Sequence, residues 1–314
     1  MLGRTANALY WLFRYLERVD NTARMIDAGL RMALTRDLVT SEEEWRSVIA
    51  AAGQREDYER NNATYTGLQA WNFMLRAQGN PMSVLSTYGL VRENARQARN
   101  VVTSEIWEAI NDGWMQISEL LKRPISEQCV NEVLSSIRQA GMLAHGAIMG
   151  TMPRDAGFHF ARAGTFIERA DNVARLLDIK YYLLLPSLNY VGSSLDTGQW
   201  DSILRAVSGD RAYRWLNTAQ IDARGIVQFL VFDERFPRSL AYCHSALREH
   251  LDALARIHGT EGESNAMMRA AVLDLDNTGL DGVFDRGLHD FLLDFLNTNG
   301  RIGLSIAEDY RFLS

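Results

Sequence analysis

"YLERVDNTARMID", residues 15–27, returns later in the chain as "FIERADNVARLLD", residues 166–178. Seven of the thirteen positions are identical across an offset of 151 residues, and six of these seven are polar. In both copies apolar side chains recur every three or four residues, which predicts a long amphipathic helix. The polar face is kept while the apolar face is exchanged, which is the reverse of an ordinary helix with a core side and a solvent side.

Two further stretches repeat in the same order. "EWRSVI" (44–49) resembles "QWDSIL" (199–204), and "NPMSVLSTYGLVRE" (80–93) resembles "FPRSLAYCHSALRE" (236–249). The offset grows from 151 to 155 and then 156 residues, as small insertions after a tandem duplication would produce.

The duplication predicts how the chain is organised. Repeat one covers about residues 1–150 and repeat two about residues 151–314, and no Pro/Gly/Ser-rich linker separates them. Duplicated helical units commonly pack about a pseudo-twofold axis, as identical subunits do about a true one. We therefore expect a single domain, residues 1–314, that forms one compact multi-helix bundle.

The fold class predicted is all-α, with about ten to twelve helices. Only five prolines occur in 314 residues, and no run of alternating β-branched residues bounded by turns appears. Three serine-acid stretches have the pattern of helix starts, "TSEEEW" (40–45), "TSEIWE" (103–108) and "ISEQ" (125–128).

Composition narrows the class of protein. Hydrophobic residues make up 47% and charged residues 23%, with a net charge of −6 and a pI near 5.6. This balance fits a globular protein and argues against a nucleic-acid partner, because no basic field is present. The two cysteines fit a reducing compartment, and no apolar run approaches the length of a membrane span. We expect a cytoplasmic protein without a membrane partner, and the sequence leaves the oligomeric state open.

The repeated stretch places four polar side chains on one helix face. They follow the spacing i, i+3, i+4 and i+7 in both copies. The two sets are Glu17, Asp20, Asn21 and Arg24, and Glu168, Asp171, Asn172 and Arg175. Three interpretations stay open at this point: a buried structural network, a ligand or catalytic site, and a solvated face.

If the stripe is a site, its chemistry is limited by its residue types. Arg18, Arg169 and the two stripe arginines have forked guanidinium groups that suit carboxylates or phosphates. Glu17 and Glu168 are the catalytic candidates, and nearby arginines favour their ionised form and hence a general-base role. The remaining stripe residues, with Arg18 and Arg169, are candidates for substrate binding. The Arg-Glu pairs that align in the stretches 80–93 and 236–249 are further candidates: Arg92, Glu93, Arg248 and Glu249.

No metal site and no cofactor are expected. The six histidines show no ligand spacing, and a calcium loop threaded through residues 274–285 lacks the bidentate Glu and has Asp281 at an apolar position. The same stretch resembles a phosphatase D-x-D motif, but it needs a strand that the pattern does not predict; a loop between helices fits it better. No Gly-rich phosphate loop occurs, so the chain is not expected to bind ATP by itself.

Three features together resemble the bacterial alpha-E family, an alpha-helical domain with an ER motif. They are the two Glu-Arg helices, the pattern "NPMS…RENAR…SEIWEAIN" in the first half and the stretch "GTMPRDAGFHFARAGTFIERAD" in the second half. The resemblance covers essentially the whole chain, and Glu17–Arg18 and Glu168–Arg169 correspond to its motif. It implies a gene neighbourhood with two partners, an ATP-grasp peptide ligase and a transglutaminase-like peptidase. Repeat two departs from repeat one at Phe236 in place of Asn80 and at His250 in place of Asn94, so any site is expected to be asymmetric.

Three hypotheses for the function follow. The first is a non-nucleotide-binding helical component of an ATP-grasp-linked system that forms peptide or amide bonds. It would bind substrate or ligase through the duplicated Glu-Arg layer. The second is a scaffold whose Glu-Arg pairs only hold the helices, and the third is an independent enzyme with Glu17 or Glu168 as general base.

Overall fold

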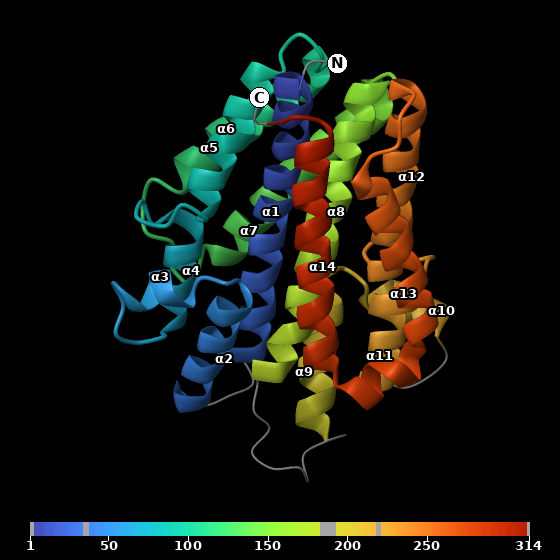
Figure 1. Ribbon diagram of the computed structural model, residues 1–314. Coiled ribbons are helices and arrows are strands. Elements are labelled where there is room, and N and C mark those ends of the chain that lie inside the picture. Colours follow the sequence, from blue (N-terminus) through green and yellow to red (C-terminus); the bar gives the residue numbers. More distant parts are fainter. Residues whose placement is uncertain (1–2, 34–37, 183–192, 218–220, 313–314) are drawn as a thin grey trace.

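The computed structural model describes residues 3–33, 38–182, 193–217 and 221–312 (Figure 1). All regular elements in these ranges are helical, so the all-α prediction is confirmed. The described residues form fourteen α-helices and one π-helical turn, more than the ten to twelve expected. The first half contains α1 (Gly3–Ala33), α2 (Leu38–Ala51), α3 (Arg55–Glu59), α4 (Gly67–Arg76), α5 (Val84–Gln97), α6 (Ser104–Leu120) and α7 (Val130–Thr151). The second half contains α8 (Ala156–Tyr182), α9 (Ser194–Ala206), α10 (Asp210–Leu216), α11 (Ala223–Val227), the π turn (Gln228–Phe232), α12 (Leu240–His258), α13 (Glu263–Arg286) and α14 (Leu288–Asp309).

The two helices that carry the repeated stretch, α1 and α8, lie side by side in the middle of the molecule (Figure 1). Helices α5 and α7 pack against α1, and α12 and α14 pack against α8. Both α2 and α9 contact the central pair. At the crossing, a Cβ on Gly164 would lie 2.2 Å from the carbonyl oxygen of Tyr10, so only glycine allows this close approach.

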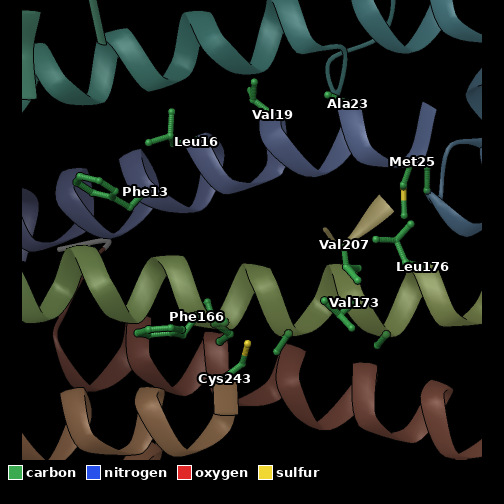
Figure 2. Packing of buried hydrophobic residues seen from close by; sticks show 14 of the residues in the cluster. Phe13, Leu16, Val19, Ala23, Met25, Phe166, Val173, Leu176, Val207 and Cys243 are labelled. Carbon is green, nitrogen blue, oxygen red and sulfur yellow. The ribbon is translucent and has the colours of Figure 1, made fainter. Parts of the chain in front are cut away.

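Apolar side chains of the central pair form the core on either side of the crossing. Leu16 and Val19 from α1 are buried, and so are Val173 and Leu176 from α8 (Figure 2). Burial of a side chain of this size contributes about 1.5–3 kcal/mol, so these contacts hold the two helices in a fixed register. That register determines where the polar stripes meet.

Matching positions of the two repeats have matching local structure. Ser83 and Ser239 are the N-caps of α5 and α12, and each side chain accepts a hydrogen bond from a backbone N–H three residues on. After α2 and α9 the chain turns through a left-handed residue, Gly53 with φ of +70° and Ser208 with φ of +57°. These details are what a pseudo-twofold would produce; that such an axis relates whole repeats stays a prediction.

Three local predictions are wrong and one is confirmed. The "TSEEEW" stretch (40–45) does not start a helix, because α2 begins two residues earlier, at Leu38. Thr103 caps α6 as expected, accepting from the backbone N–H of Ile106. The "ISEQ" stretch (125–128) does not start a helix, because α7 begins at Val130 with Cys129 as its N-cap. Residues 270–279, expected as a loop, lie in α13, whose only break is the positive φ of Gly279.

Candidate functional site

The two Glu-Arg motifs pair with each other across the α1–α8 contact. Arg169 donates through Nε and Nη2 to the carboxylate of Glu17, at 2.8 and 2.9 Å. In return Arg18 donates through Nε and Nη2 to Glu168, the latter bond at 3.0 Å. Each glutamate therefore binds the arginine of the other repeat by a forked pair of hydrogen bonds.

The next pair of the stripe also reaches across the repeats. Arg24 donates to Asp20 on its own helix, and its Nη1 donates at 2.9 Å to the carbonyl oxygen of Ala206, the last residue of α9. Arg175 likewise donates to Asp171, and its Nη1 reaches the carbonyl oxygen of Ala51, the last residue of α2. Cations are favoured at helix C-termini, where unpaired carbonyl groups carry partial negative charge.

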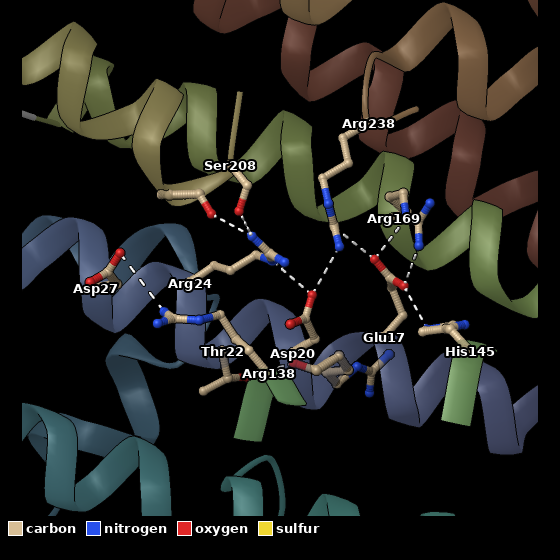
Figure 3. A network of polar contacts seen from close by, with 12 residues as sticks. Glu17, Asp20, Thr22, Arg24, Asp27, Arg138, His145, Arg169, Ser208 and Arg238 are labelled. Atoms are coloured by element: carbon tan, nitrogen blue, oxygen red, sulfur yellow. Dashed lines mark hydrogen bonds and ion pairs between the residues drawn. The ribbon is translucent and has the colours of Figure 1, made fainter. Parts of the chain in front are cut away.

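The half around Glu17 is filled by protein atoms, and we call its five ion-paired residues the closed network: Glu17, Asp20, Arg24, Arg169 and Arg238. Arg238 bridges the two carboxylates, with Nη1 at 2.9 Å from Glu17 and Nη2 at 3.0 Å from Asp20 (Figure 3). His145 Nε2 lies 3.2 Å from the other oxygen of Glu17, and the Ser208 hydroxyl accepts from Arg24 at 2.9 Å. Glu17 is completely buried.

Electrostatics keep Glu17 ionised despite its burial. Desolvation opposes the charged form, but Arg169 and Arg238 outweigh it and hold the pKa of Glu17 well below its usual range. Burial lowers the pKa of His145, so this ring is neutral near pH 7. A carboxylate with a low pKa and both oxygens engaged is a stable ion-pair partner and a poor proton acceptor.

The half around Glu168 borders a cavity of about 230 Å³, which we call the open pocket. Two replacements explain the space: Met82 stands in sequence where repeat two has Arg238, and Gly53 stands where it has Ser208. The Arg175 side chain is 38% exposed, whereas the equivalent Arg24 is 7% exposed. The residues that line the open pocket are Arg18, Asn21, Thr22, Met25, Ala52, Gly53, Gln54, Met82, Glu168, Asp171, Asn172 and Arg175.

Both asparagines of the repeated stripe line the open pocket. Asn21 and Asn172 are 4% and 6% exposed. The side-chain Nδ2 of each is buried without a hydrogen-bond partner among the described residues. Buried polar atoms in folded proteins are nearly always paired, so two unpaired amides on one cavity indicate room for an acceptor.

Glu168 is also held in the ionised form. Burial disfavours its charge, but Arg18 and Arg14 outweigh this and lower the pKa of Glu168 to about 2. Arg14 donates to it through Nε at 2.9 Å. The open pocket therefore contains a fixed negative charge at its inner wall.

Of the predicted site residues, the structure brings together the two stripes and both motif arginines. The four candidates from the third repeated stretch lie apart from them. Arg92 and Glu93 are exposed on α5, where Arg92 bonds Asn111. Arg248 is half-buried and Glu249 exposed on α12. Among the described residues, no hydrogen bond or ion pair joins any of these four to Glu17 or Glu168.

Sequence reasoning missed the residues that distinguish the two halves. Arg238 and Met82 lie inside an aligned motif, between matched proline and N-cap serine positions. A charged residue opposite an apolar one inside otherwise matched motifs was the available signal. His145 and Arg14 had no such signal, because both lie outside the three repeated stretches.

Two further findings concern the described part of the chain. It contains no group of three or more His, Cys, Asp or Glu residues placed to hold a metal ion. It also contains no helix with the length and apolar character needed to cross a membrane.

Comparison with known proteins gives a family match over nearly the full length. The model of the Alpha-E family, described as a predicted alpha-helical domain with a conserved ER motif, matches residues 1–311. An uncharacterized protein of Mycobacterium bovis and one of Mycobacterium tuberculosis are each 24% identical over 279 residues. The match covers 83% of this chain but 30% of each mycobacterial protein, so the chain spans less than a third of those relatives. No solved structure matches the chain significantly.

Proposed function

The chain belongs to the Alpha-E family, and we propose that it is a non-nucleotide-binding component of a bacterial ATP-grasp-linked system that forms peptide or amide bonds. In this role the open pocket binds the substrate. The observation that carries the proposal is the pocket itself, because both copies of the repeated polar stripe contribute to one cavity. A face that only holds helices together has no need of a cavity with unpaired amides.

The chemistry of the pocket suits a small polar substrate. It offers acceptor atoms on Glu168 and Asp171 and donor groups on Arg18, Arg175 and the stripe asparagines. Its volume of about 230 Å³ lies below the range of roughly 300–1,000 Å³ found for sites of drug-sized ligands. An amino acid, or one end of a peptide, fits that size.

The closed network supports a structural role for the first half of the duplicated layer. Glu17 is surrounded by Arg169, Arg238 and His145 and is not one of the residues that line the open pocket. Breaking a buried pair by removing one partner costs several kcal/mol, so the scaffold hypothesis accounts for this half. Among the two catalytic candidates, the geometry favours Glu168, which borders the cavity, over Glu17.

The length of the relatives supports a function that is carried out in contact with other domains. Most of each mycobacterial relative lies outside the matched segment, so a domain of this kind also occurs within longer chains. The sequence contains no phosphate-binding loop, so an ATP-grasp partner would supply the nucleotide chemistry. A transglutaminase-like peptidase would act on the amide product.

The test combines the purified chain with an ATP-grasp protein from its gene neighbourhood, the partner that the family resemblance implies. We expect a complex in light scattering and a faster release of ADP when the chain is present. The substitution Asp171→Asn, in the open pocket, should reduce the stimulated rate of ADP release without dissociating the complex. Asp276→Asn, on the exposed side of α13, is the matched control and should behave as the parent. Absence of both a complex and any change in ADP release would overturn the proposal.

The independent-enzyme hypothesis is checked in the same assay without the ligase. Turnover by the chain alone that is lost in Glu168→Gln and kept in Asp276→Asn would favour it. No turnover without the ligase would leave the partner hypothesis as the better account.

A further inference from the structure

The closed network shows which group fills the space that is vacant in the open pocket. In the closed network, Asp20 accepts hydrogen bonds from two guanidinium groups, those of Arg24 and Arg238. Among the residues that the structure describes, the equivalent Asp171 accepts only from Nε of Arg175, which both of its oxygens share at 2.8 and 3.1 Å. The second cationic donor is missing because Met82 replaces Arg238.

We propose that the open pocket binds the zwitterionic end of a free α-amino acid. The ligand's ammonium group lies beside Asp171, in the place that corresponds to the Arg238 guanidinium beside Asp20. Its carboxylate accepts hydrogen bonds from the amides of Asn21 and Asn172. The inference rests on the proposed function in one respect, namely that the occupant of the pocket is the substrate.

The ammonium follows from the missing donor at Asp171. This carboxylate is 20% exposed, whereas Asp20 is 6% exposed, so its free lone pairs face the cavity. A cationic donor there restores the second ion pair that Asp20 has in the closed network. Charge-assisted hydrogen bonds of this kind are about twice as strong as neutral ones.

The carboxylate follows from the unpaired amides and from the charge balance. Both Nδ2 groups are donors without an acceptor, and both lie on the cavity wall. The charged groups that line the cavity are two guanidinium groups, those of Arg18 and Arg175, and the carboxylates of Glu168 and Asp171, so its wall carries no net charge. A ligand with a cation alone would add an unbalanced charge to this wall, whereas a zwitterion adds no net charge.

A free α-amino acid is the molecule that presents both groups within a single small cavity. The N-terminus of a peptide lacks the adjacent carboxylate, and its C-terminus lacks the adjacent ammonium group. An N-acetyl amino acid lacks the ammonium group, as the C-terminus of a peptide does. An amino acid amide lacks the carboxylate, as the N-terminus of a peptide does. Comparison of the three forms therefore distinguishes a free amino acid from either end of a peptide.

The experiment is calorimetric titration of the chain alone with L-alanine, L-glutamate and L-arginine, which differ only in side-chain charge and size. We expect at least one of them to bind with a Kd of about 1 mM or tighter, and its N-acetyl and amide forms to bind at least about tenfold more weakly. Met82→Arg copies the closed network and should weaken binding by about tenfold or more, because its guanidinium takes the ammonium position. Met115→Arg, which adds the same charge at an exposed position of α6, is the matched control and should bind as the parent.

Two results would overturn the inference: no binding of any of the three with a Kd below about 10 mM, or equal binding by Met82→Arg and the parent. If Met82→Arg does not fold, Asp171→Asn takes its place and should weaken binding by a similar factor. The titrations contain neither ATP nor ligase, so their failure is distinct from failure of the complex with the ATP-grasp protein.

Discussion

The closed network and the open pocket are built from the same repeated stripe, yet they differ in what completes them. Around Glu17 the chain supplies Arg238 and the Ser208 hydroxyl, and no side chain of the network exceeds 15% exposure. Around Glu168 the equivalent positions are Met82 and Gly53, and a cavity of about 230 Å³ remains. Two side-chain differences therefore separate a layer whose five charged groups pair with one another from a polar pocket.

The two halves of a duplicated unit can therefore take different roles, one structural and one specialised for binding. A structural half keeps its charges paired internally, because unpaired buried charges cost several kcal/mol. A binding half leaves donors and acceptors incompletely paired, and groups kept for binding often reduce stability. Variants in each half, and acid, should therefore affect stability to different degrees.

Removal of the carboxylate charge should harm the closed network more than the open pocket. For Glu17→Gln we expect a loss of about 3–5 kcal/mol, because Arg169 and Arg238 keep their buried charges without a partner. Glu168→Gln should lose roughly 1–3 kcal/mol, since Arg14 and Arg18 are 17% and 24% exposed and reach water. Thermal unfolding measures this, at about 2 °C per kcal/mol for a chain of this length. Equal losses in the two variants would end the distinction between a structural half and a binding half.

Acid should reveal the ion pairs of Glu168. Its folded pKa of about 2 lies below the usual value of 4.5, so the stabilisation is complete above about pH 4.5 and is lost as the pH falls through about 2. Between these limits the free energy of unfolding of the parent should fall more steeply than that of Glu168→Gln, by up to about 1.4 kcal/mol per pH unit. Urea unfolding at several pH values between 3 and 6 provides the measurement. Histidine titration occurs in both proteins and cancels in the difference; parallel profiles would contradict the assignment.

Arg238→Met converts the closed network toward the composition of the open pocket. Glu17 and Asp20 would each lose one donor but keep Arg169 and Arg24, so the expected loss is about 1–3 kcal/mol. Urea unfolding compares this variant with Arg235→Met, a neighbour whose side chain is 63% exposed and whose removal should change stability much less. A loss no greater than that of the control would mean that Arg238 does not complete the network.

Substitutions at Gly53 should have the smallest effect on stability. A Cβ at this position would lie 3.4 Å from Nη1 of Arg175, and the φ of +70° is strained for any L-residue. Gly53→Ala should therefore lose about 1 kcal/mol, whereas Gly53→Ser should recover about 0.5–1 kcal/mol through a hydroxyl that pairs with Arg175, as Ser208 pairs with Arg24. The difference between the two variants in chemical unfolding is the measured quantity. A serine variant no more stable than the alanine variant would show that the turns after α2 and α9 are not equivalent.

Residue patterns alone predicted the elements and the residues of the layer, but not its internal pairing. The spacing of Glu17, Asp20, Asn21 and Arg24 placed them on one face, and the structure has them there. The choice between a solvated face, a structural network and a site required burial, which depends on what packs over the stripe. Arg92 and Glu93 show the limit, because an aligned motif placed them beside the stripe as candidates and the fold keeps them exposed on α5.

Local residue patterns were enough to predict the helical class, the duplicated polar stripe and the start of α6, because periodicity and capping act over a few residues of one chain segment. Only the tertiary structure decided that Glu17 pairs with Arg169 and Glu168 with Arg18, residues about 150 positions apart. It also decided that Arg238 enters one half of the layer and that Met82 leaves the other half open. Such contacts depend on the register and crossing of α1 and α8, which the packing of the whole core sets and no local pattern encodes.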